Sequence, residues 1–147
     1  MCSSGRGQIQ ISLSYCTRRR ALLVTVHRAT NLLPMDSNGF SDPFVKLALV
    51  EDATDNHRQQ RFLDYSAARA TAKKLTGRKM AGRGSQSTSI KRKTLNPEWN
   101  EEFIFATRLT ELMKLTLCLT VWDKDFGKSN DYLGTANINH FIPYLFF

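Results

Sequence analysis

The chain has 147 residues, which suits a single domain, and its 41% hydrophobic content fits a globular protein with a real core. The net charge of +8 is concentrated in residues 57–93, which carry +10, so the rest of the chain is −2 and the sequence predicts a local patch for polyanions. No apolar run approaches the roughly 20 residues of a transmembrane helix, and no signal peptide is visible. We therefore expect a cytoplasmic protein whose membrane contact is peripheral.

Runs of apolar residues predict strands along most of the chain. Residues 8–15 alternate polar and apolar side chains, as a half-buried strand does, and residues 21–26 are apolar enough for a central strand. Pro43 disfavours helix at the residue before it and marks where the third strand begins. The remaining predicted elements are strands at 44–50, 102–106, 115–122 and 132–138, and one helical turn at 109–113. Short strands with turn signals and little helix predict an all-β sandwich.

Residues 51–90 interrupt this pattern. Gly, Ser, Arg, Lys and Ala dominate there, and β-branched residues are few, so the composition predicts a disordered insertion between the third and fourth strands. A basic amphipathic helix is the alternative, because five side chains recur at helical spacing: Phe62, Tyr65, Ala68, Ala72 and Leu75.

Two short segments at predicted strand ends carry five aspartates: Asp36 and Asp42 in the first, and Asp123, Asp125 and Asp131 in the second. Carboxylates gathered this way suit calcium, which takes about 6–8 oxygen ligands in flexible geometry. Without a cation they would raise one another's pKa and destabilise the native state. Their spacing excludes an EF-hand, whose loop requires a glycine and a glutamate at fixed positions that hold other residues here.

Other functional classes find less support in the residues. Residues 57–93 lack the interleaved aromatic residues of a nucleic-acid stacking platform, so no specific nucleic acid is expected. Nothing pairs a nucleophile with a base, and no Gly-rich phosphate loop appears, so we do not expect an enzyme. Cys2, Cys16 and Cys118 match no metal motif and are expected to be reduced thiols.

Taken in order, the motifs resemble those of the C2 domain, the calcium-dependent phospholipid-binding β-sandwich. The resembling segments are 7–9, 22–24, 31–33, 35–39, 41–46, 93–103 and 121–123. Residues 127–134 are most similar to the second C2 domain of rabphilin and of related double-C2 and synaptotagmin-like proteins. The resemblance covers most of the chain outside the insertion.

The resemblance implies an eight-stranded antiparallel sandwich that binds calcium between loops at one end. This chain departs from the family pattern in the long basic insertion between strands three and four, and in ending soon after Gly134. We therefore expect one C2 domain over residues 1–147, with an insertion at about 51–90 and with the last strand missing through C-terminal truncation.

The resemblance also implies a set of site residues. By motif position, all five aspartates bind calcium, two ions in total, and the backbone carbonyls near Met35 and Lys124 add ligands. Phe126 is expected to enter the lipid headgroup region, the alternative being that it packs on its own loop. A basic patch on the third and fourth strands is expected to contact phosphoinositides or SNARE proteins, unless it is only a solvated face; its residues are Lys46, Lys91, Arg92 and Lys93.

The function that follows is calcium-dependent binding to anionic phospholipid membranes in vesicle trafficking or exocytosis, at a synaptic or secretory vesicle or the plasma membrane. The alternative is a calcium-independent protein-interaction module that uses the basic fourth strand or the insertion.

Overall fold

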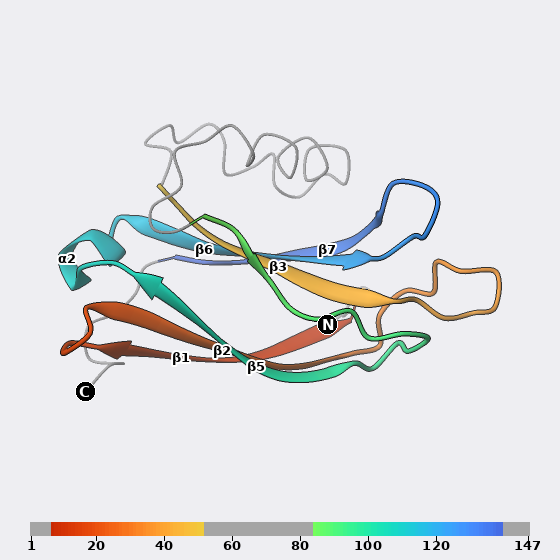
Figure 1. Ribbon diagram of the computed structural model, residues 1–147, viewed down its shortest axis with the longest axis horizontal. Helices are drawn as coiled ribbons and strands as arrows, with labels where there is room; N and C mark the ends of the chain where they lie inside the picture. Colours follow the sequence, from red (N-terminus) through yellow and green to blue (C-terminus); the bar gives the residue numbers. More distant parts are fainter. Residues whose placement is uncertain (1–6, 52–83, 140–147) are drawn as a thin grey trace, which may run out of the picture.

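The computed structural model describes residues 7–51 and 84–139. Over these residues seven strands form two antiparallel sheets packed face to face (Figure 1). The first sheet has the order β1-β2-β5 and the second the order β4-β3-β6-β7. The elements are β1 (Gln8–Cys16), β2 (Ala21–Thr30), β3 (Pro43–Glu51), β4 (Gln86–Ser87), β5 (Glu98–Ala106), α2 (Leu109–Leu112), β6 (Leu115–Asp123) and β7 (Asp131–Ile138). The predicted all-β sandwich is confirmed.

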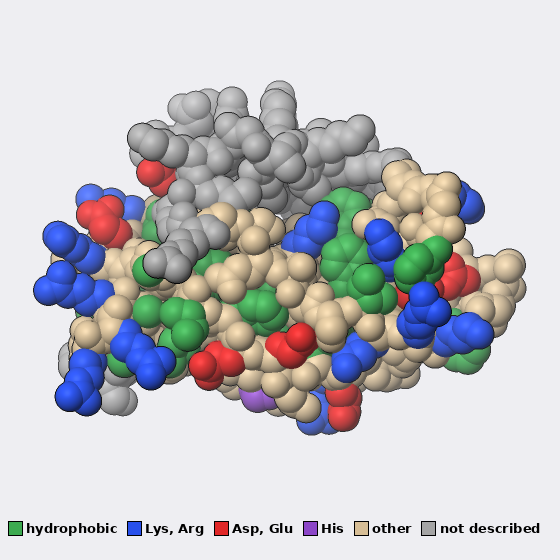
Figure 2. All heavy atoms as spheres, viewed as in Figure 1, with side chains coloured by type: hydrophobic (Ala, Val, Ile, Leu, Met, Phe, Trp, Pro, Cys, Tyr) green, Lys and Arg blue, Asp and Glu red, His purple; other side chains and the backbone are tan. Residues whose placement is uncertain are grey.

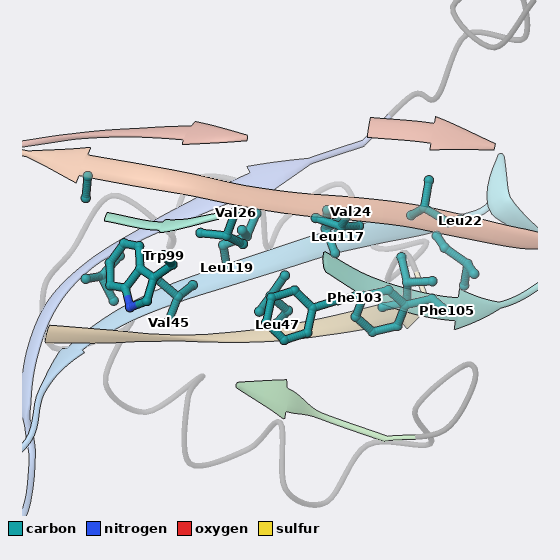
Figure 3. Close-up of a cluster of buried hydrophobic side chains, with 14 of the residues drawn as sticks. Leu22, Val24, Val26, Val45, Leu47, Trp99, Phe103, Phe105, Leu117 and Leu119 are labelled. Carbon is teal, nitrogen blue, oxygen red and sulfur yellow. The ribbon is translucent and has the colours of Figure 1, made fainter. Parts of the chain in front are cut away.

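The core lies between the two sheets (Figure 3). In β6 the alternate residues Leu115, Leu117, Leu119 and Val121 are buried, as their spacing predicts. Trp99 of β5 is also buried, and its Nε1–H donates a 2.9 Å hydrogen bond to a backbone carbonyl, so its polar atom is satisfied inside the core. This packing fixes the two sheets relative to each other and therefore fixes the loops that join them.

The two ends of the sandwich differ. The 31–42 loop, between β2 and β3, and the 124–130 loop, between β6 and β7, lie together at one end, which we call the loop end (Figure 1). The turn 17–20, between β1 and β2, and α2 lie at the opposite end, which we call the turn end (Figure 1). All five aspartates belong to the loop end.

The fourth strand lies earlier in the chain than the sequence predicts. β4 falls within the region assigned to the insertion and pairs with β3, whereas residues 91–93 form no strand. The ladder stops because the Thr88 hydroxyl, rather than a backbone carbonyl, accepts the Val45 N–H at 2.9 Å. Thr88 and Lys91 nevertheless donate backbone hydrogen bonds to β3, so residues 88–91 follow its edge. The rest of the predicted insertion, 52–83, and the predicted truncation beyond 139 lie outside the described residues.

β5 begins at Glu98, four residues before the predicted start of this strand. Its first half is polar and carries a bulge opposite β2, where Asn100 adopts a positive φ of 51°. Because of this polar composition and the bulge, the first half of β5 does not show the apolar–polar alternation that predicts a strand.

Candidate metal centre

Three carboxylates converge at the loop end. Asp36, Asp42 and Asp123 each offer a carboxylate oxygen, and these oxygens all lie within 4.8 Å of one another. The sheet explains why two of them meet: β3 pairs with β6 so that Pro43 lies opposite Asp123, which brings the preceding Asp42 beside Asp123. Asp36 reaches the same point from the 31–42 loop.

Asp123 is the buried member of this group. Its side chain is fully buried, its Oδ1 accepts a 2.7 Å hydrogen bond from the Asp42 N–H, and its Oδ2 has no hydrogen-bond partner among the described residues. Burial raises the pKa of the Asp123 carboxyl; the Asp42 N–H opposes this, and the charges of Asp36, Asp42 and Asp131 raise the pKa further. A buried, unpartnered carboxylate oxygen destabilises the fold unless a cation or proton meets it.

Asp42 links this group to residues 91–93, the segment we call the basic segment. Its Oδ1 accepts a 2.7 Å hydrogen bond from the Lys93 N–H, and Thr94 N–H bonds the carbonyl of Ser41 at 2.9 Å. Lys93 reaches this position with a positive φ of 51°. The sequence indicated a lysine side chain for lipid contact, but it gave no sign that the backbone of this residue holds a carboxylate in place.

The 31–42 loop is held by its own hydrogen bonds. Gly39 N–H donates to the Asp36 carbonyl at 3.0 Å, and Asp36 N–H donates to the Phe40 carbonyl at 2.9 Å. Gly39 has a φ of 83°, a left-handed conformation that glycine adopts without strain. Ser41 is fully buried, and its hydroxyl bonds two backbone groups of the same loop. These contacts fix the direction in which Asp36 and Asp42 point.

The other two predicted ligands lie outside the three-carboxylate group. Asp131 starts β7 directly opposite Asp123, close enough for its charge to act on the Asp123 carboxyl. Asp125 instead forms a 3.7 Å ion pair with Lys128, and its N–H donates to Asn130 Oδ1 at 3.1 Å. The structure thus brings three of the five aspartates together and leaves Asp131 and Asp125 beside them.

Met35 and Lys124 directly follow or precede two of the clustered aspartates in the sequence, Met35 before Asp36 and Lys124 after Asp123. The Met35 N–H donates to the Ser41 hydroxyl at 3.1 Å, and the Lys124 N–H donates to the Asp42 carbonyl at 2.9 Å. Their assignment as carbonyl ligands stays a prediction.

Phe126 projects from the 124–130 loop with 61% of its surface exposed. The Arg92 guanidinium lies 4.6 Å from the centre of its ring and Lys124 Nζ lies 5.9 Å away. Both distances fit cation–π contacts, so an exposed aromatic ring and two cations form one tip beside the carboxylates.

Lys46 of β3 lies apart from that tip. Its Nζ is 5.1 Å from the Trp122 ring and 5.8 Å from the Phe44 ring. Within residues 7–51 and 84–139, the salt bridges are Arg28–Glu98 and Lys128–Asp125, so Lys46 and the basic segment have no carboxylate partner there.

Among the described residues, no helix has the length and apolar character needed to cross a bilayer.

Comparison with known proteins places this fold. The family described as C2 domain matches residues 20–63 and 74–141. Rabphilin-1 of Caenorhabditis elegans is 34% identical over 129 residues, which are 88% of this chain and 9% of that protein. The chain therefore spans about a tenth of the length of this relative.

Two solved structures show the same architecture. The RIM C2A domain from Drosophila has a TM-score of 0.67 at 22% identity, covering 91% of this chain and 86% of that one. The C2A domain of plant Extended Synaptotagmin 1 has a TM-score of 0.55 at 28% identity, covering 82% of this chain and 68% of that one. This chain therefore belongs to the C2 domain family and fits its rabphilin-like, double-C2 type.

Proposed function

We propose that this domain binds anionic phospholipid membranes in response to calcium and acts in vesicle trafficking or exocytosis. The observation that carries the proposal is the cluster of Asp36, Asp42 and Asp123, in which a buried Asp123 oxygen lacks a partner. A C2 fold that gathers carboxylates at one end supports the same function. Two calcium ions would bind, with Asp131 and Asp125 completing the ligand set together with the backbone carbonyls of Met35 and Lys124.

Calcium would act first on the electrostatics of the loop end. Five ionised aspartates place about −5 formal charges there, which repel one another and repel an anionic bilayer. Divalent cations remove this repulsion, and each calcium retains coordination positions that lipid phosphate oxygens can fill. The ion would thus connect the protein directly to the membrane.

The surrounding cations and the exposed ring would then strengthen the contact. Arg92, Lys124 and Phe126 form the tip nearest the cluster, so calcium-bound lipid would meet them together. Each basic residue near an anionic leaflet contributes about 1 kcal/mol, so the three of the basic segment would add about 3 kcal/mol. Phosphoinositides would be suitable lipids for this surface, and SNARE proteins would be its protein partners. Such a domain would work as a peripheral membrane protein on the cytoplasmic side of a vesicle or the plasma membrane.

Liposome sedimentation tests the proposal. The double variant Asp123→Asn, Asp125→Asn is expected to lose calcium-dependent sedimentation with phosphatidylserine vesicles, because it removes the buried ligand and one flanking ligand. The matched control is Glu102→Gln, Glu111→Gln, which removes the same charge from exposed positions away from the cluster. Unchanged sedimentation of the aspartate variant, or equal loss in the control, would contradict the proposal.

A calcium-independent protein-interaction module is the second candidate, favoured by the absence of carboxylate partners for the basic segment within the described residues. The variant Lys91→Gln, Arg92→Gln, Lys93→Asn tests it; asparagine suits position 93 because it tolerates the positive φ found there. If the wild-type domain captures an acidic partner in chelator and this variant does not, the second candidate is supported. If the variant captures the acidic partner as well as the wild type does, the basic segment is only a solvated surface.

A further inference from the structure

β1 forms an outer edge of the first sheet. The sheet order is β1-β2-β5, so β1 pairs with β2 on one side, and no other described strand lies along its second side (Figure 1). The backbone N–H and C=O groups on the outer side of an edge strand can form a ladder with a further strand. Neither the candidate metal centre nor the proposed membrane contact uses β1.

β1 lacks most of the features that protect a sheet edge. Charged side chains, proline and very short strands discourage pairing with another chain. This strand is nine residues long and reads QIQISLSYC, with no charged residue and no proline. Its pairing with β2 has a bulge after Gln10, and residues 11–16 then continue the ladder without interruption. The regular part of the strand is therefore long enough to pair with another.

The other sheet edges among the described residues are less suited to pairing. β5, at the opposite edge of the same sheet, carries Glu98, Glu101 and Glu102, and Figure 2 shows acidic side chains along this strand. β4 has only two residues. β7 begins with the charged Asp131 and contains Gly134, and a glycine inside a strand weakens it. Of these edges, β1 is the one that most readily accepts a further strand.

The two faces of β1 carry different side chains. Ile9, Ile11 and Leu13 pack against the core but stay only partly buried. The residues that alternate with them are polar and exposed: Gln8, Gln10, Ser12 and Ser14. A further strand with the same alternation would cover the apolar side chains and leave the polar ones in water, which stabilises the pairing.

A second copy of β1 has this alternation. A two-fold axis perpendicular to the sheet pairs the two strands antiparallel and keeps equivalent faces on the same side, so residues opposite one another come from the same face. Apolar residues therefore meet apolar residues. Because β1 carries no charge, the pairing brings no like charges opposite each other. The two three-stranded sheets then become one continuous sheet.

We propose that two copies of this chain associate through antiparallel pairing of their β1 strands. One strand pair is smaller than a standard interface of about 1,200–2,000 Å², so the dimer is expected to be weak and to depend on protein concentration. Because the paired strands run in opposite directions, the loop ends of the two copies point away from each other (Figure 1). Association through β1 therefore leaves the aspartates accessible and needs no calcium.

Sedimentation velocity of the full chain in chelator, from low micromolar to several hundred micromolar protein, tests the proposal. Salt at about 0.15 M shortens the Debye length to about 8 Å and limits repulsion between chains of net charge +8. The variant Ser12→Lys, Ser14→Lys places lysines on the exposed face of β1, where pairing brings them close to those of the second copy. We expect a reversible dimer in the wild type and an association about tenfold weaker in the variant. If the double variant does not unfold cooperatively, Ser14→Lys alone serves the same purpose, because it keeps the hydrogen bond between Ser12 and His27.

The matched control is Thr110→Lys, Asn137→Lys, which adds the same charge at exposed positions on α2 and β7. The proposal expects this control to associate as the wild type does. A wild type that stays monomeric at every concentration would overturn the proposal, as would equal weakening in the control.

Amide hydrogen exchange at low and high protein concentration locates the contact. Protection of residues 8–14 that increases with concentration supports pairing through β1. Protection of these residues that is independent of concentration would show that the edge is covered within a single chain, and it would overturn the proposal. An increase confined to another strand would overturn it as well.

Discussion

The two aspartate-bearing loops of the loop end are built differently. In and around the 31–42 loop, backbone N–H groups and the buried Ser41 hydroxyl hold Asp36 and Asp42 in place, and both carboxylates belong to the three-carboxylate group. In the 124–130 loop, Asp125 is engaged with Lys128, and that loop contributes no member to the group. Asp36, Asp42 and Asp123 therefore already lie together in the structure, whereas Asp125 is held by its ion pair with the exposed Lys128.

This difference implies a sequence of events at the loop end. A first calcium ion would meet Asp36, Asp42 and Asp123 where they already stand, with little rearrangement of the loops. Recruitment of Asp125 would require its ion pair with Lys128 to open. On this proposal the group of Asp36, Asp42 and Asp123 would govern whether calcium binds, and the 124–130 loop would adjust the affinity.

The largest effect is expected from Asp123→Asn, which alters the three-carboxylate group. In chelator we expect this variant to be more stable than the wild type by about 1–3 kcal/mol, because a buried charge with an unpartnered oxygen is removed. We expect calcium to produce no further rise in the stability of this variant. Thermal unfolding with and without calcium measures both effects, and a variant that is destabilised in chelator, or still stabilised by calcium, would contradict this picture.

A pH series tests the same carboxyl without mutation. Because the Asp123 pKa is raised in the fold, the folded state holds this proton more tightly than the unfolded chain, and stability in chelator should increase as pH falls through the raised pKa. Calcium requires the ionised form, so the stabilisation by calcium should shrink over the same pH range. Unfolding scans across acidic pH check this, with Asp123→Asn as the control that lacks the proton.

A smaller effect is expected from Phe126→Ala, which alters the tip of the 124–130 loop. Because Phe126 is exposed and contacts cations rather than the carboxylates, its loss should weaken calcium-dependent vesicle binding several-fold while calcium affinity in solution stays unchanged. Vesicle co-sedimentation and calcium calorimetry on the same variant separate the two steps. Parallel losses in both would show that the ring supports the loop rather than the membrane contact.

The smallest effect is expected from Lys128→Gln, which removes the internal cation beside Asp125. An exposed pair of this kind contributes about 0.2–1 kcal/mol, so calcium affinity should rise by at most about fivefold. Lys114→Gln at the turn end removes the same charge far from the site and should have no comparable effect. A fall in calcium affinity on Lys128→Gln would show that the ion pair orders the loop for binding instead of competing with it.

Much of this fold follows from hydrophobic periodicity. The alternation in β1 and β6 and the apolar density of β2 and β3 identify strands because their buried faces repeat every second residue. β4 escaped prediction because two residues paired to a sheet edge carry no periodic signal, and β5 was shortened by its polar, bulged first half.

The candidate site was predictable only in part. Acidic residues at strand ends indicated where a cation belongs, but the β3–β6 register decides that Asp42 and Asp123 touch. The hydrogen bond from Lys93 N–H to Asp42 and the contact of Arg92 with the Phe126 ring depend on segments that are distant in the sequence. A linear sequence carries no local signal for such contacts.

The most direct test of the central claim is thermal unfolding of the unmodified chain with calcium and with chelator. A ligand that binds only the folded state stabilises it by about 2.7 kcal/mol at a hundred times its dissociation constant, which for a domain of this size is a rise of about 5–10 °C in Tm. We expect a single cooperative transition whose Tm rises with calcium and not with magnesium. A cooperative transition that calcium leaves unchanged would contradict the assignment of Asp36, Asp42 and Asp123 as a calcium site.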